Sequence, residues 1–328
     1  MNAELLSLCE AFAANREALR TTFHFEYDTL LSVCANNFTA RGLTATEERL
    51  KAARELLKNE TGPFSNFRGT GRLAFISLLA ASREPEALLA RSLRNYEALK
   101  GCFHRSEYLA LGAAILADMA PEDDPERRAL AGRSLYERMK EEHRFLTSAE
   151  DSVFALLLTF SDKSEDALIA EMEESYRALK ERFSSSNAVQ AASHVLCLGE
   201  GGSARRVEAL LALYDGFTAR GRRYGRHYEL PILAALSVLD REPASTVEDV
   251  LAIDGALAGL RGYRSIFGID KKTRLSHAAM LAADGDLGAR PMEAAALAGT
   301  VAMVAAQQAA MCAVICSTTA TSAAAASG

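Results

Sequence analysis

A repeat of about 40 residues is the sequence feature that most limits how this chain can fold. The pattern Tyr-x-x-(Leu or Met)-Lys recurs at steps of 40, at residues 96–100, 136–140 and 176–180. A second pattern, Leu-basic-x-x-Phe, recurs at steps of 80 and begins at Leu19, Leu99 and Leu179. Weaker copies continue the same register at Leu57, Met139, Leu213 and Leu260. Such self-similarity is typical of proteins that stack one small structural unit many times.

Each repeat has the pattern of two helices joined by a short loop. The first segment is amphipathic, as in residues 49–58 and 92–100, with apolar residues every three or four positions. The second segment, as in residues 108–119 and 230–239, is apolar nearly all round, so it must be buried on every side. The first segments are therefore predicted to form an outer layer around the second. We expect the loop phenylalanines to fill the gaps between consecutive hairpins, namely Phe23, Phe64, Phe67, Phe103, Phe145, Phe183, Phe217 and Phe267.

The predicted fold class is all-α, with about seven αα hairpins that form an α-solenoid or an α/α toroid. Alanine and leucine dominate the composition, tryptophan is absent, and alternation of the kind seen in strands is rare. The sequence leaves open whether the array closes into a ring. Residues 1–290 are expected to form a single helical-repeat domain, and residues 291–328 an uncharged, alanine-rich C-terminal helix with a frayed tail.

Charge and cysteine usage limit the partners and the compartment. The net charge of −6 argues against nucleic-acid binding, which requires a basic face. The first residues carry Glu4 and Glu10 rather than the basic start of a signal peptide. The cysteines stand singly in apolar runs, as expected for reduced thiols of a cytoplasmic protein, at Cys9, Cys34, Cys102, Cys197, Cys312 and Cys316.

The predicted N-termini of the inner helices are expected to converge on one surface, which carries most of the candidate binding residues. The full set of candidates is Arg68, Arg72, Glu107, Glu150, Asp151, His194, His227, Glu229 and Lys271. Carboxylates and imidazoles can bind a divalent metal ion or transfer protons, and arginines at helix N-termini can hold an anion.

Structural roles explain the same residues without a ligand. Thr147–Glu150 matches a capping box, and acidic residues are favoured in a first helical turn. His194 lies in an apolar segment, where a hydrogen-bonded core histidine is the common case. The basic run at residues 220–227 is interpreted as a solvated loop, with phosphate binding as the alternative. The sequence contains no HExxH, Cys/His zinc spacing, phosphate-binding loop or GxSxG motif, so no catalytic residue, metal or cofactor is assigned.

The C-terminal region has no charged residue from Ala294 to Gly328. Residues 294–317 are long enough to span a bilayer, but ten of these 24 residues are alanine, and Gln307 and Gln308 lie in the middle. The favoured interpretation is a buried helix or a contact between copies in a homo-oligomer. Membrane insertion is the alternative.

Several motifs resemble one bacterial protein family. They occur in one order along nearly the whole chain: residues 61–69, 143–151, 193–194, 229–231 and 270–272, followed by the tail with Gln307 and Gln308. The family is DUF4003, a domain of unknown function. Its His-Pro-Phe-Leu-Thr tract has Arg144 in place of proline here. The resemblance implies a bacterial origin and supplies no activity, ligand or catalytic residue.

The leading functional hypothesis is a binding protein without catalytic activity, which takes a protein, peptide or small ligand at its inner helices. One alternative is an α/α-toroid enzyme that uses the carboxylates and histidines named above. The other is a protein that associates with membranes through its C-terminal apolar segment.

Overall fold

The computed structural model describes residues 3–199, 201–227, 229–263 and 269–287. Within these residues the chain forms fourteen α-helices and one short 3-10 helix, η1 (Asn66–Arg68), and no strand. The predicted all-α class is confirmed. The predicted C-terminal helix at residues 291–328 and its membrane-spanning alternative lie outside the described residues. No helix in the described ranges is both long enough and apolar enough to cross a bilayer.

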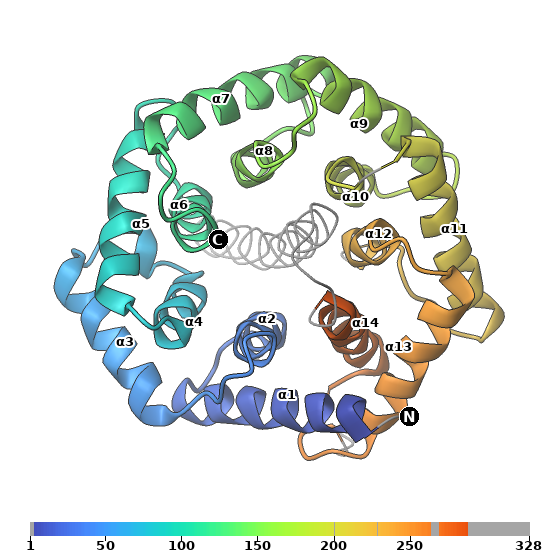
Figure 1. Cartoon of the computed structure of the whole chain (residues 1–328), viewed down its shortest axis with the longest axis horizontal. Coiled ribbons are helices and arrows are strands. Elements are labelled where there is room, and N and C mark those ends of the chain that lie inside the picture. The colour runs from blue at the N-terminus through green and yellow to red at the C-terminus, as the bar shows by residue number, and fades with distance from the viewer. Residues whose placement is uncertain (1–2, 200, 228, 264–268, 288–328) are drawn as a thin grey trace, which may run out of the picture. The chain divides into compact units, whose positions relative to one another are not determined.

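Within each of the chain's two compact units, the helices alternate between an outer and an inner layer (Figure 1). The outer helices are α1 (Ala3–Thr22), α3 (Glu47–Glu60), α5 (Pro85–Lys100), α7 (Pro125–Glu142), α9 (Glu165–Lys180), α11 (Ser203–Ala219) and α13 (Pro243–Ala258). The inner helices are α2 (Asp28–Thr39), α4 (Arg72–Ala81), α6 (Glu107–Met119), α8 (Asp151–Leu158), α10 (Ser186–Cys197), α12 (Leu230–Val238) and α14 (Lys271–Leu287). Each outer helix and the inner helix that follows it form one hairpin, so the predicted repeated helical hairpins are present.

The chain divides into two compact units. The N-terminal unit comprises residues 14–159, which include α2 to α8 and the second part of α1. The C-terminal unit holds α9 to α14 together with residues 1–13. The predictions of a solenoid or a toroid, and of one domain over residues 1–290, stay predictions.

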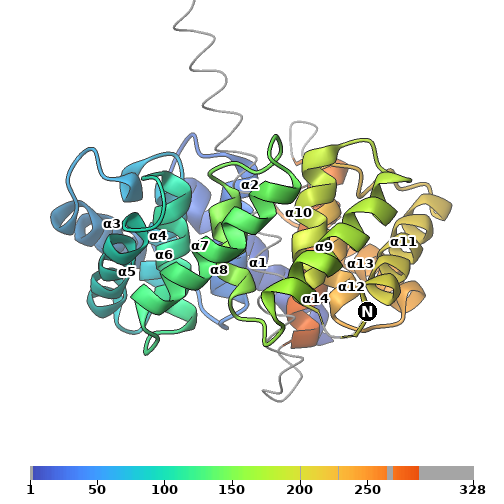
Figure 2. The ribbon, with the colours of Figure 1, turned by 90° about the horizontal axis from the view of Figure 1, so that it is seen from above.

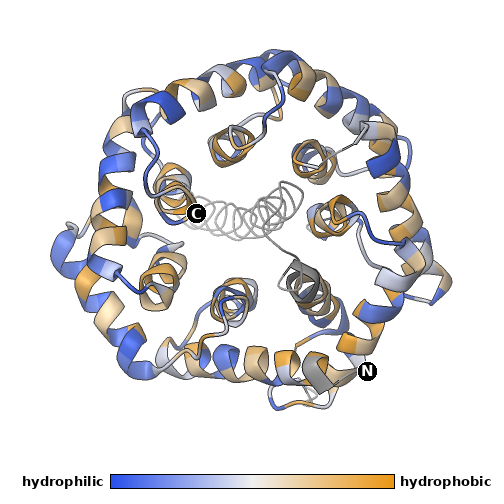
Figure 3. Cartoon of the chain, viewed as in Figure 1, coloured by the Kyte–Doolittle hydropathy of each residue, from blue (hydrophilic) through white to orange (hydrophobic). Residues whose placement is uncertain are grey.

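The hydrophobic pattern determines which helix of a hairpin is inside. In α6 every residue from Leu109 to Ala117 is buried, whereas α7 buries residues at intervals of three or four, among them Leu135 and Met139. Figure 3 shows apolar inner helices and outer helices of mixed character. A single apolar stripe needs cover on one side only, whereas an inner helix needs neighbours all round. The prediction of a buried inner layer is confirmed.

Most of the predicted register positions anchor the outer helices. The side chains at these positions in the first six repeats are at most 3% exposed: Leu19, Leu57, Leu99, Met139, Leu179 and Leu213. The seventh position differs from the prediction, because Leu260 follows the end of α13 and is half-buried. The buried leucine in the last turn of α13 is Leu257.

Three loop phenylalanines stay on the buried face because the helical hydrogen bonding continues to them. The N–H groups of Phe23, Phe103 and Phe183 donate to the carbonyls four residues earlier, those of the register leucines, at 2.8, 2.9 and 3.0 Å. An i to i+4 bond keeps two side chains on the same face of a helix. All three rings are at most 9% exposed.

Buried loop rings also join consecutive repeats. Phe67 packs edge-on against Tyr96 of α5, Phe103 against Tyr136 of α7, and Phe183 against Tyr214 of α11, with ring centroids 5.3, 5.6 and 5.0 Å apart. Each pair connects a loop to the outer helix of the next hairpin, in an arrangement that favours aromatic pairs. The prediction that loop phenylalanines fill the gaps therefore holds for these rings.

Two phenylalanines contradict that prediction, and one falls outside the described residues. The side chains of Phe64 and Phe145 are both 99% exposed. They stand seven residues after Leu57 and six after Met139, beyond the reach of the last helical turn. Phe267 is not among the described residues.

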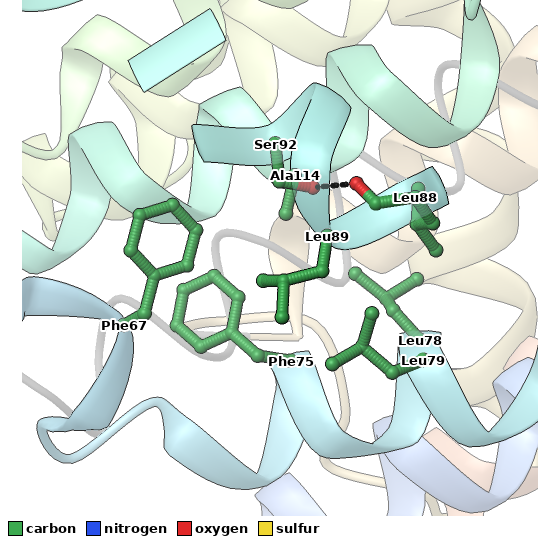
Figure 4. Close-up of a pocket in the computed structure, with 8 residues that line it drawn as sticks. All are labelled: Phe67, Phe75, Leu78, Leu79, Leu88, Leu89, Ser92 and Ala114. Atoms are coloured by element: carbon green, nitrogen blue, oxygen red, sulfur yellow. Dashed lines mark hydrogen bonds between the residues drawn. The ribbon is translucent and has the colours of Figure 1, made fainter. Parts of the chain in front are cut away.

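The core of the N-terminal unit is closely packed where α4 meets α5. The remaining gap has a volume of about 10 Å³, which is about the space that one water-sized sphere occupies. Its lining, shown in Figure 4, is apolar apart from one hydroxyl: Phe67, Phe75, Leu78, Leu79, Leu88, Leu89, Ser92 and Ala114. The Ser92 hydroxyl donates to the Leu88 carbonyl at 2.7 Å, so it needs no water. The gap is too small to hold a ligand.

Truncation of a register leucine should destabilise the fold, because it leaves a cavity in a core that cannot close. Leu99→Ala is expected to lower the free energy of unfolding by about 3 kcal/mol. Leu130 on α7 is 66% exposed, and Leu130→Ala should change stability by less than about 0.5 kcal/mol. Urea unfolding followed by circular dichroism measures both, and equal effects would contradict the assignment of Leu99 to the core.

Candidate binding surface at the inner-helix N-termini

The residues singled out from the sequence divide between the two units. The N-terminal unit holds Arg68, Arg72, Glu107, Glu150 and Asp151, and the C-terminal unit holds His194, His227, Glu229 and Lys271. In each unit these residues lie at or just before the start of an inner helix, with the exception of His194, which lies within α10.

Glu107, the first residue of α6, binds the loop of the preceding hairpin. Ser106 caps α6 by accepting a hydrogen bond from Leu109 N–H at 3.1 Å, which leaves the Glu107 carboxylate available for another role. Its Oε2 accepts a hydrogen bond from Gly71 N–H at 3.2 Å. The carboxylate lies so close to Gly69 that a Cβ there would come within 2.0 Å of Oε1. Glu107 therefore fixes the entry to α4, and a side chain at position 69 would have to displace its carboxylate.

Both arginines near Glu107 connect loops of the N-terminal unit. Arg68 donates to the Thr61 carbonyl at 3.2 Å, which closes the loop between α3 and α4. Arg72 pairs with Glu26 of the loop between α1 and α2, at 3.0 Å. The Glu26 side chain is 9% exposed, whereas that of Arg72 is 57% exposed, so the charge of Arg72 still reaches solvent.

Asp151, the first residue of α8, closes the turn that precedes the helix. Its Oδ2 accepts from Ser148 N–H at 2.8 Å, and its own N–H donates to the Ser148 carbonyl at 3.1 Å. The capping box predicted at Thr147–Glu150 stays a prediction. Asp151 is 5% exposed, and burial raises the pKa of its carboxyl group to about 7, with the nearby Glu150 charge adding to the effect.

Glu229 occupies the equivalent place in the C-terminal unit and is fully buried. Its Oε2 accepts from the N–H groups of Arg226 and His227, at 3.2 and 3.1 Å. Lys272 places its Nζ atom 2.5 Å from Oε1. The carboxylate therefore connects the start of α12 with the start of α14, while Lys271 and the His227 side chain face solvent.

Sequence reasoning missed Asp254, which pairs with an arginine of the basic run at residues 220–227. This α13 carboxylate is 2% exposed and pairs with Arg274 at 2.6 Å and with Arg222 at 3.4 Å. A lone aspartate on the buried face of a helix was the available signal, but its partners are distant in sequence. Arg220 pairs with Glu248, and Arg226 donates to the Tyr214 hydroxyl at 2.8 Å. Three of the four arginines in residues 220–227 are thus engaged within the C-terminal unit.

The two histidines of the inner helices are buried. His277 of α14 is 1% exposed, and its Nδ1 atom lies 2.8 Å from the Tyr263 hydroxyl. Its ring packs edge-on against Phe12 with centroids 5.5 Å apart. His194 is 3% exposed within α10. In the ranges that the structure describes, no three histidine, cysteine or acidic side chains are grouped so as to hold a metal ion.

Fully exposed phenylalanines are the feature of this surface that sequence reasoning missed. Phe25, Phe64 and Phe145 are 104, 99 and 99% exposed, and each stands in a loop that leads from an outer to an inner helix. We call the four such loops of the N-terminal unit, residues 23–27, 61–71, 101–106 and 143–150, the loop edge. Figure 2 shows these loops along one side of that unit.

The backbone conformation of these loops directs the rings into solvent. Phe64 and Phe145 each occupy the third position of a turn, closed by hydrogen bonds from Ser65 N–H to the Gly62 carbonyl and from Leu146 N–H to the His143 carbonyl, both 3.0 Å long. Phe25 has a φ of +71°, in the left-handed region that side chains with a Cβ avoid.

Two arginines of the loop edge form no ion pair within the described ranges, whereas its carboxylates are paired or half-buried. Arg105 and Arg144 are exposed and make no ion pair among the described residues. Glu26 is paired with Arg72, and Glu150 is half-buried. The opposite side of the unit carries loops with the carboxylates Glu84, Glu122, Asp123 and Asp124 together with Arg83, and Asp123 pairs with Arg127 and Arg128.

A second concave feature lies between α3 and α5 on the outer face of the N-terminal unit. This groove has a volume of about 280 Å³, close to the lower limit for small-ligand sites. Its lining is mostly apolar and includes the charged residues Arg49, Arg83 and Glu86.

Substitution at Gly69 tests the contact with Glu107. Gly69→Ala should displace the carboxylate from Gly71 N–H and lower the free energy of unfolding by about 1–2 kcal/mol. In a Glu107→Ala background the same change should cost less than about 0.5 kcal/mol, because the obstructing group is gone. A double-mutant cycle from urea unfolding measures the difference, and additive effects would contradict the contact.

The raised pKa of Asp151 predicts a pH-dependent stability. Between about pH 4 and pH 7 the folded chain holds a proton that the unfolded chain has released, so this group makes stability fall as the pH rises through that window. Asp151→Asn keeps an acceptor for Ser148 N–H and removes the ionisation. Its stability relative to the wild type should increase by about 2 kcal/mol between pH 5 and pH 8. A difference independent of pH, measured by urea unfolding, would contradict this assignment.

Comparisons with known proteins agree with the resemblance seen in the motifs. The uncharacterized protein YeaA of Bacillus subtilis (strain 168) is 25% identical over 229 residues, which cover 67% of this chain and 68% of that protein. No solved structure matches the chain. A model of the DUF4003 family, described as a protein of unknown function, matches residues 15–310. The chain therefore belongs to the DUF4003 family.

Proposed function

We propose that this chain is a binding protein without catalytic activity and that its partner docks on the loop edge. The observation that carries the proposal is the complete exposure of Phe25, Phe64 and Phe145. Single apolar side chains on a protein surface are ordinary. Three fully exposed aromatic rings at the same structural position of three hairpins favour a contact surface.

Stability of the fold does not account for these rings. Phe64 and Phe145 contribute no burial, and Phe25 adopts a left-handed backbone conformation that costs about 1–2 kcal/mol in a residue with a Cβ. Glycine would remove that cost. Strained residues of this kind are common at functional sites.

The carboxylates at the inner-helix N-termini support a binding role over an enzymatic one. Glu107, Asp151 and Glu229 already accept hydrogen bonds from backbone N–H groups of the preceding loops. Aromatic rings and arginines are the side chains that contribute most to protein binding surfaces, and on the loop edge the three exposed rings, Arg105 and Arg144 remain free.

The thiols favour a reducing compartment, and we propose the cytoplasm. Cys9, Cys34, Cys102 and Cys197 are unpaired. Burial raises the pKa of Cys9 to about 11 and that of Cys34 to about 12, so these thiols are unreactive. Free, buried cysteines are typical of proteins that need no disulfides.

Native mass spectrometry of the protein purified from its own host tests the function. The wild type is expected to carry a bound species that slows hydrogen exchange in residues 23–27, 61–71 and 143–150. A variant with Phe25→Ser, Phe64→Ser and Phe145→Ser should keep its urea midpoint and lose the species.

Two results would refute the proposal. One is a bound species that survives the triple substitution. The other is protection that maps elsewhere, for example to the groove between α3 and α5. Leu130→Ser is the matched control, because Leu130 is an exposed apolar residue on α7, outside the loop edge.

A further inference from the structure

We infer that the loop edge binds the surface of an anionic lipid bilayer, with Phe25, Phe64 and Phe145 entering the interfacial layer and Arg105 and Arg144 meeting the headgroups. This inference rests on the proposed function and names the partner. It concerns peripheral binding by the N-terminal unit and involves no membrane-spanning segment.

The separation of the rings favours a bilayer over a folded protein. Energetically important residues of protein interfaces cluster at the centre of a contact and fill pockets. Here each ring stands on its own loop, and Phe64 and Phe145 belong to hairpins separated by a third one, α5 and α6. A bilayer interface is a continuous plane, so it can accept each ring independently. Aromatic side chains are enriched at that level of a membrane.

The turns present the rings outward without disturbing the core. Phe64 is three residues from Phe67, which is 1% exposed and packs against Tyr96 of the next hairpin. Thr147 is buried two residues after Phe145, and its hydroxyl donates to the Met139 carbonyl at 3.2 Å. Each exposed ring is therefore held close to a fixed point of the core, which lowers the entropy lost on binding.

The charge distribution favours one orientation on an anionic surface. Arg105, Arg144 and the exposed part of Arg72 lie on the loop edge or at its border, together with exposed His24 and His104. On the opposite side of the unit, the exposed carboxylates of Glu84, Glu122 and Asp124 would be repelled by the same surface. Clustered Lys and Arg side chains near a membrane attract anionic lipids, which are abundant on the cytoplasmic leaflet.

Some carboxylates near the loop edge weaken this attraction. Glu60 at the end of α3, and Glu141 and Glu142 at the end of α7, are exposed. The cations alone therefore do not hold the chain on the surface. Binding should need the rings and the charges together, as it does for peripheral proteins that use two weak signals.

Vesicle flotation with the full-length chain tests the inference. Wild-type protein is expected to float with vesicles of equimolar phosphatidylglycerol and phosphatidylcholine, and much less with phosphatidylcholine alone. Each single Phe→Ser substitution should lower the partition constant about tenfold, and the triple substitution more than about 100-fold. Arg105→Glu with Arg144→Glu should lower binding to anionic vesicles about tenfold and make it less sensitive to salt.

Leu130→Ser serves as the control and should float like the wild type. Urea midpoints equal to that of the wild type show that the variants are folded, which the full exposure of the substituted rings predicts. Flotation of the triple variant at the wild-type level would overturn the inference and would assign binding to another segment, such as the uncharged C-terminal region. Equal binding to both kinds of vesicle would overturn the role of the arginines.

Absence of flotation by the wild type would also overturn the inference, and the proposed function would then be judged separately. If hydrogen exchange still maps a co-purified species to the loop edge, the function stands and the partner is not a lipid surface. A dimer seen by sedimentation without vesicles, and lost in the triple variant, would identify a second copy of the chain as the partner.

Discussion

Burial of the inner helices on every side is the constraint on which the rest of the structure depends. A helix such as α6 or α12, with an unbroken run of buried residues, cannot be covered by its own outer helix alone. It needs neighbouring hairpins, so repeats of this kind become stable only when they are stacked. This packing buries the sides of each hairpin that face its neighbours. The loops at the two ends of each hairpin are therefore the places where the chain can vary without loss of the core.

Carboxylates at the starts of the inner helices accept hydrogen bonds from the loops that precede these helices. Each inner helix begins after a short loop whose N–H groups need acceptors. Glu107, Asp151 and Glu229 provide them, although each reaches a different group. Glu107 binds the loop of the preceding hairpin, Asp151 binds the residue three positions earlier, and Glu229 binds the N–H groups two and three positions earlier. Carboxylates that could be taken for active-site residues in the sequence thus hold the loops in place. The groups that remain exposed around them are the phenylalanine rings and arginines of the loop edge.

The repeat period and the hydrophobic pattern predict the hairpins and the buried register because both are local properties of the chain. The repeat also distinguishes buried from exposed phenylalanines, by their distance in sequence from the register leucine or methionine of each repeat, but we did not use this distance in the prediction. Phe23, Phe103 and Phe183 stand four residues after a register leucine and remain within its last helical turn, whereas Phe64 and Phe145 stand farther away. The partners of Asp254 and Glu229 could not be predicted, because Arg274 comes from the other helix of its hairpin and Lys272 from a different hairpin, and only the packing of the helices brings them near.

Because the chain contains no tryptophan, one substitution can report directly on the loop edge. Phe64→Trp places a single indole at a position where the native ring is 99% exposed. We expect the emission of a water-exposed indole in the free protein, and a blue shift with quenching when vesicles containing brominated phosphatidylglycerol are added. A blue-shifted emission in the free protein would contradict the exposure of the ring, and an emission that vesicles leave unchanged would contradict its contact with lipid.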